Sequence, residues 1–250
     1  MTDFMVHLPG NFRYVYQFAS GLSQYRCVEA SLSMAGQIAY PTRYANPTQL
    51  MSQIYTQYVG PDVSSDTRGT TKEQALEWLH SQNIGYVDME PLLGNLDELH
   101  AEIQAQNRQN VPQLITIGDE SFLHDAKSGH TLHNWADALN HGAHTMLRVG
   151  YSDVMGYGLY EEPAAAPNFS QPVAIPWQNF LEGHIVGCIA IMPHGVPTPP
   201  SGFSFQHGTW PIPPKPKPVF DALKAESTLA AAMAALASLQ HDLDVLKTEV

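Results

Sequence analysis

The 250-residue sequence is poor in charged side chains. Asp, Glu, Lys and Arg make up 14% of it, against roughly 25% in an average soluble domain. The few charges are mostly acidic, with 24 Asp and Glu against 12 Lys and Arg and a formal net charge of −12 at pH 7. This balance argues against nucleic acid and anionic membranes as partners, since both select basic surfaces.

Cysteine is equally scarce, and long apolar runs are absent. Two cysteines, Cys27 and Cys188, are too few for a disulfide framework. No apolar run reaches the roughly 18 residues that span a bilayer. The first residues also lack the basic and then apolar pattern of a signal peptide. We therefore expect a protein without a membrane span, either cytoplasmic or associated with a virion.

Composition divides the chain into three parts. Residues 1–192 are mixed in character, and the overall hydrophobic content of 44% is enough for a folded core. Residues 193–218 contain nine prolines, which favour an extended, semi-rigid linker. Residues 219–250 contain neither Gly nor Pro and are rich in Ala and Leu, which predicts a helix.

The C-terminal helix has an apolar residue at alternating spacings of three and four. This heptad pattern is typical of a coiled coil. It predicts self-association into a homo-oligomer, or docking on a protein partner, through residues 219–250; docking on the helix's own domain is the alternative. The seam consists of Leu229, Ala232, Leu236, Leu239, Leu243, Leu246 and Val250.

Patterning within residues 1–192 predicts an α+β domain in which a helical lobe packs on an antiparallel sheet. Capping residues predict two of the helices: Thr70 and Thr71 precede Glu73 and Gln74, and Asn95 precedes Glu98. Helices are expected at 28–40, 47–58, about 72–80 and about 96–107, and strands at 12–16, 114–117, 145–149, 158–161 and 185–192.

Cys27 and His144 are candidates for nucleophilic catalysis. Cys27 starts a predicted helix, where free amides and the helix dipole stabilise a thiolate, although a free Cys is also a common core residue. His144 starts a predicted strand, which would hold its imidazole rigidly as a general base. Glu162 ends the next predicted strand, from which a carboxylate can orient the imidazole.

These segments together resemble the bacteriocin-processing (double-glycine) cysteine peptidases of the papain-like superfamily. Cys-Val-Glu-Ala-Ser-Leu at 27–32 is similar to their Cys-Gly-Pro-Ala-Ser-Leu helix start. Residues 144–151 match their His-apolar-Gly-Tyr strand, and 160–164 their strand that ends in Asp-Pro. The aromatic segment 14–18 is similar to the strand that carries their oxyanion Gln. The resemblance covers roughly residues 10–192 in order.

The resemblance implies a papain-like fold and cleavage of a peptide or isopeptide bond in a peptide or protein substrate, without a cofactor. Cys27 would attack the carbonyl, His144 would transfer the proton and Glu162 would orient His144. Either Gln17 or Gln24 would stabilise the oxyanion. We favour Gln17, because a side chain at the end of a strand can point across the cleft at a helix start.

Departures from the family pattern, the ambiguity of the oxyanion Gln among them, leave a second hypothesis open. Val28 and Glu29 replace the usual Gly-Pro after the nucleophile, and Glu162 stands where Asp is expected. The chain would then be an inactive, peptidase-like assembly protein that binds a partner or itself through residues 219–250. Hydrolysis of peptidoglycan cross-links is a third hypothesis.

Histidine is abundant, with twelve residues, five of them between 124 and 144. The spacings His130-x-x-His133 and His141-x-x-His144 are compatible with a metal site, but no nearby side chains complete a convincing ligand set. We favour a polar loop over the cleft, and no metal. Cys188 lies in an apolar run and is expected in the core.

Overall fold

The computed structural model describes residues 4–18, 22–23, 25–63, 65, 68–118, 143–152, 155–165, 171–182 and 185–192. The expected proline-rich linker at 193–218 and the expected heptad helix at 219–250 lie outside the described residues. So do Gln24 and the histidines between 124 and 141. The sequence-based expectations for these segments stay predictions.

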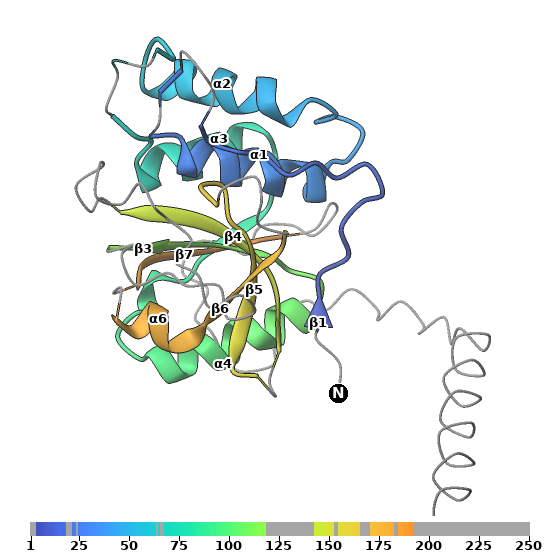
Figure 1. Cartoon of the computed structure of the whole chain (residues 1–250), viewed down its shortest axis with the longest axis vertical. Coiled ribbons are helices and arrows are strands. Elements are labelled where there is room, and N and C mark those ends of the chain that lie inside the picture. The colour runs from blue at the N-terminus through green and yellow to red at the C-terminus, as the bar shows by residue number, and fades with distance from the viewer. Residues whose placement is uncertain are drawn as a thin grey trace, which may run out of the picture. The chain divides into compact units, whose positions relative to one another are not determined.

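A seven-stranded sheet with antiparallel pairing forms the centre of the domain (Figure 1). Its order is β2-β7-β3-β4-β5-β6, and β1 pairs with β4 off this path. Strands that are distant in sequence therefore lie side by side, as β3 does with β7. The strands are β1 (Phe4–Met5), β2 (Tyr86–Asp88), β3 (Gln113–Ile117), β4 (His144–Ser152), β5 (Tyr157–Glu161), β6 (Val173–Pro176) and β7 (Ile185–Ile191).

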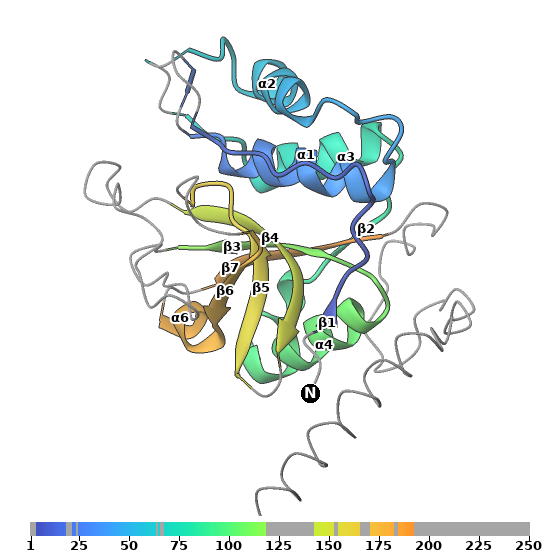
Figure 2. The same ribbon diagram turned by 45° about the vertical axis from the view of Figure 1, so that its right-hand side comes forward.

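Helices cover both faces of this sheet. Figures 1 and 2 show α1 (Cys27–Ala39), α2 (Pro47–Tyr58) and α3 (Lys72–Ser81) on one face. The opposite face carries α4 (Leu96–Arg108) and α6 (Trp177–Glu182), and a 3-10 turn, η1 (Glu90–Leu92), follows β2. The mixed helix and antiparallel sheet architecture agrees with the sequence-based expectation. The second helical layer was not expected.

The helix starts differ in how they are capped. Asn46, Thr71 and Asn95 each accept a hydrogen bond from the first turn of α2, α3 and α4, and Thr71 forms the expected capping box with Gln74. Arg26, at the start of α1, makes no side-chain cap hydrogen bond. The N-terminal turn of α1 therefore begins at Cys27 without a capping side chain.

The strand expected at 12–16 is wrong. This segment runs along α1 without joining the sheet (Figures 1 and 2). Its backbone is paired with a side chain instead: Arg13 donates its N–H to Gln37 Oε1 at 2.8 Å and accepts from Gln37 Nε2 at 2.9 Å. Phe12 and Tyr14 pack against the core. These aromatic residues, which favour strands, therefore pack over α1 here instead of joining the sheet.

The core lies mainly between α1 and the sheet. Leu32 and Met34 of α1 are fully buried, as are Leu147 and Val149 of β4. This packing brings the start of α1 to the sheet strand that begins at His144. Within the described residues, no helix combines the length and hydropathy that crossing a membrane requires.

Candidate active site

His144 and Glu162 form a buried hydrogen-bonded pair. His144 is the first residue of β4, and Glu162 directly follows β5, which pairs with β4. The imidazole Nε2 and the carboxylate Oε1 are 2.7 Å apart, and the two side chains are 2% and 0% exposed. This bond orients the ring and leaves the second nitrogen, Nδ1, for another partner.

Cys27 is the second hydrogen-bond partner of the imidazole. Burial alone would lower the pKa of His144, but the charge of Glu162 and hydrogen bonds to Cys27 and Glu162 outweigh it. The net effect raises the pKa of His144 well above its ordinary value. This shift favours the protonated form of the imidazole, and its partner Cys27 is partly exposed at the start of α1.

The Glu162 carboxylate is fixed by its surroundings. Oε1 also accepts from the Ala164 N–H at 2.9 Å, and the Glu162 carbonyl accepts from the Tyr14 hydroxyl at 2.6 Å. Burial, followed by the nearby Glu162 charge, raises the pKa of Tyr14, so its hydroxyl stays a donor. The adjacent Glu161 is buried too, and burial raises its pKa to about 7, but it is Glu162 that reaches His144.

Gln17 lies between the end of β5 and the start of α1. Its N–H donates to the Pro163 carbonyl at 2.8 Å, and its own carbonyl accepts from Arg26 Nη2 at 2.5 Å. The residue is buried, with 2% of its surface exposed. The structure thus ties Gln17 both to the residue after Glu162 and to the residue before Cys27. Gln24, the other candidate, lies outside the described residues.

A pocket of about 500 Å³ opens beside Cys27. Lys72 stands at this pocket, and its charge is neutralised by ion pairs with Asp88, at 2.7 Å, and Glu90. Val186 is 49% exposed, which leaves an apolar surface open to a ligand. The aliphatic side chains that line the pocket are Val28, Ala75, Leu114, Ala143, Val186 and Ile189, with Thr70, Thr71, Thr116 and Thr145 among them.

Two buried polar contacts near Cys27 were missed by the sequence analysis. Arg26 pairs with Asp62 at 3.2 Å, and Glu29 accepts a hydrogen bond from Thr70. Glu29 had been noted only as a departure from a family pattern. Burial raises its pKa to about 7, so the carboxyl is largely protonated below neutral pH. The sequence did carry a signal for these contacts, since Arg26 and Glu29 are charged residues close to a candidate nucleophile in a chain with few charges.

The other sequence predictions for chemistry have the following outcomes. Cys188 is in the core as expected, with its Sγ 3.6 Å from the Met89 Sδ, and burial raises its pKa to about 12. Across the described residues no three His, Cys, Asp or Glu side chains are grouped to hold a metal. His130, His133 and His141, whose spacing was compatible with a metal site, lie outside that part of the chain.

Comparison with known proteins gives little beyond this geometry. No family model matches the sequence, and no curated protein matches it. Among solved structures, the chain is similar to a Bacillus anthracis protein described as a candidate C39-like peptidase, with 16% identity and a TM-score of 0.48. The similarity covers 78% of this chain and 99% of the other. It is too distant to bear on function.

Proposed function

We propose that the protein is a papain-like cysteine peptidase that resembles the bacteriocin-processing peptidases and cleaves a peptide or isopeptide bond. The observation that carries the proposal is the buried His144–Glu162 pair next to Cys27 at the uncapped start of α1. A thiol, a base and a carboxylate that orients the base are the three groups that nucleophilic acyl transfer requires.

The reaction proceeds in two halves. The Cys27 thiolate attacks the substrate carbonyl, and protonated His144 gives its proton to the leaving amine as the C–N bond breaks and a thioester forms. His144, now neutral, takes a proton from water as the resulting hydroxide attacks the thioester; the C–S bond breaks, the carboxylic acid is released, and the Cys27 thiolate and protonated His144 are restored. Glu162 keeps the imidazole in one orientation throughout.

Stabilisation of the oxyanion falls to groups at the start of α1. The tetrahedral intermediate places negative charge on the former carbonyl oxygen, and donors aimed at that oxygen lower the barrier. The backbone N–H groups of the first turn, which no capping side chain occupies, are one source. The carboxamide of Gln17 is the second, since this residue is tied to the residue that precedes Cys27.

The pocket beside Cys27 supports a substrate with an apolar side chain close to the scissile bond. Its lining is mainly apolar, and the ammonium group of Lys72 is already paired with two carboxylates. A substrate carboxylate would therefore gain little there. The overall charge of −12 also favours the approach of neutral or basic segments over acidic ones.

A second candidate function is that of an inactive peptidase-like assembly protein. It is favoured by Glu29, whose fully buried carboxyl stands two residues after Cys27, where the family pattern has Pro. In this function the heptad segment 219–250 binds a partner or a second copy, and the site near Cys27 is not used.

Selective alkylation separates the two functions. With iodoacetamide at pH 6, Cys27 should react because the His144 imidazolium stabilises its thiolate, whereas Cys188 should stay unlabelled because it is buried. The His144→Ala variant should lose this labelling while it keeps its fold by circular dichroism. Equal, alkaline-only labelling of Cys27 in both proteins would refute the peptidase proposal and leave the assembly protein.

A further inference from the structure

Arg26 is a buried cation directly before the candidate nucleophile. None of its surface is exposed, which is rare for an arginine and costly unless every donor finds a partner. Nε donates to the Ser23 carbonyl at 2.6 Å, Nη2 to the Gln17 carbonyl at 2.5 Å and Nη1 to Asp62 Oδ2 at 3.2 Å. The guanidinium thus connects three separate points of the chain.

Asp62 is the counter-ion, and it is held as firmly as Arg26. Its side chain is 6% exposed. Oδ2 also accepts from the Ser52 hydroxyl at 2.8 Å, and Oδ1 accepts from the Ser23 N–H at 3.0 Å. Ser52 belongs to α2, so the carboxylate fixes the position of Arg26 relative to a neighbouring helix. Buried ion pairs seldom add much stability, but they do select one geometry.

We propose that Arg26 and Asp62 are a positioning pair that holds Gln17 in place to stabilise the oxyanion formed at Cys27. This inference rests on the proposed peptidase function. Gln17 belongs to no helix or strand, so no regular ladder of hydrogen bonds fixes it. The Pro163 carbonyl and Arg26 hold its backbone from two sides. Arg26 thereby couples the position of Gln17 to that of the next residue, Cys27.

An arginine is required for this role because of its shape. The planar guanidinium presents donors in a fixed fork, which suits three acceptors in different directions. A lysine would keep the charge but offers a single nitrogen on a flexible stem, so it cannot span the Gln17 carbonyl, the Ser23 carbonyl and Asp62 together. A displacement of about 1 Å in such a group is enough to cost about 100-fold in rate.

Two reactions of Cys27 distinguish positioning of Gln17 from a general role in folding. Hydrolysis of p-nitrophenyl acetate passes through a tetrahedral oxyanion, whereas alkylation by iodoacetamide does not. In the full chain, Arg26→Lys should lower kcat for the ester about tenfold or more with KM little changed. Its alkylation rate at pH 6 should stay within about twofold of the wild type.

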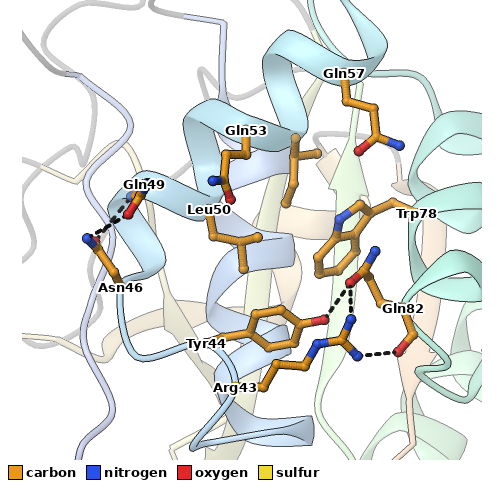
Figure 3. A pocket seen from close by; sticks show the side chains of 10 residues that line it. Arg43, Tyr44, Asn46, Gln49, Leu50, Gln53, Gln57, Trp78 and Gln82 are labelled. Carbon is orange, nitrogen blue, oxygen red and sulfur yellow. Dashed lines mark hydrogen bonds between the residues drawn. The ribbon is translucent and has the colours of Figure 1, made fainter.

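Arg43→Lys is the matched control. Arg43 also donates to a backbone carbonyl and a side chain, here Gln82 O at 3.2 Å and Gln82 Oε1 at 2.8 Å, as Figure 3 shows in the groove between α2 and α3. This arginine is exposed and has no contact with Gln17 or Asp62. Its variant should leave both rates of Cys27 unchanged.

A double-mutant cycle with Gln17→Ala gives the decisive outcomes. If Arg26 acts through Gln17, the double variant should be no slower with the ester than Gln17→Ala alone. The inference would be overturned if the losses in esterase rate of the two single variants multiplied in the double variant. It would also be overturned if Arg26→Lys lowered the esterase and alkylation rates equally. If Arg26→Lys does not fold, Asp62→Asn takes its place in the same cycle. A wild type that neither labels at pH 6 nor hydrolyses the ester refutes the peptidase function instead.

Discussion

Replacement of Glu162 by Gln tests the chemistry of the candidate site most directly. The substitution keeps the size of the side chain and removes its charge. The two side chains are at most 2% exposed, and their closest atoms are 2.7 Å apart. The attraction between the Glu162 carboxylate and the His144 imidazolium is therefore hardly screened by water, and nearly all of it should be lost when the charge is removed. Burial, which now acts unopposed by Glu162, should bring the pKa of His144 down.

The size of the effect follows from this geometry. An opposite charge within hydrogen-bond distance shifts a pKa by about 1 to 3 units, and each unit corresponds to about 1.4 kcal/mol. The ratio of the thiolate–imidazolium pair to the neutral thiol–imidazole pair should therefore fall about 10- to 1,000-fold. Turnover should fall at least as much, since an amide can also present the wrong group to the imidazole.

The assay is the rate of Cys27 alkylation between pH 5 and 9, measured by mass spectrometry. Glu161→Gln is the control, because Glu161 is the adjacent residue, equally buried, and burial already raises its pKa to about 7. It should react like the wild type. Equal losses in the two variants, or an unchanged profile in Glu162→Gln, would refute the assigned role of Glu162.

Three further predictions concern stability and assembly. Burial raises the pKa of Glu29 to about 7, so the unfolded state releases this proton at lower pH than the folded state does. The free energy of unfolding should therefore fall by up to about 3 kcal/mol as the pH rises from 4.5 to 7. Urea unfolding of Glu29→Gln should lack this part of the decline, and the same dependence of the unfolding free energy on pH in variant and wild type would contradict the prediction. Gly150→Ala should lower the melting temperature by several degrees, because a Cβ there would lie 2.1 Å from the Phe4 carbonyl oxygen, and an unchanged value would count against the β1–β4 pairing. Truncation after Pro218 should reduce the oligomeric mass in light scattering, whereas an unchanged mass with a lower melting temperature would indicate intramolecular docking.

The elements that sequence analysis predicted well carry local signals. Capping residues at 71 and 95 predicted two helix starts, because these residues act within one turn of the helix. The strands expected at 145–149 and 158–161 lie within β4 and β5, because both segments are β-prone along their length. Strands β1, β2 and β6 were missed, since two to four residues are too few for a periodic pattern.

The wrong strand at 12–16 has a different cause. Its aromatic residues have high strand propensity, but propensity measures how well a side chain fits a half-buried surface. Here the surface is supplied by the helical side of the domain, and Gln37 satisfies the backbone of Arg13 in place of a neighbouring strand. A single sequence does not distinguish these two ways of covering a core.

The candidate site combines a predictable part with an unpredictable one. Cys27, His144 and Glu162 lie at ends of regular elements, so their meeting follows once the elements pair. Arg26 and Asp62 are 36 positions apart, and Asp62 lies in a loop with no periodic signal. Only the packing of α2 against α1 brings that loop to the start of α1, so the contact depends on tertiary structure. The groups expected to perform the reaction are thus readable from sequence, whereas the groups that hold them in place require the fold.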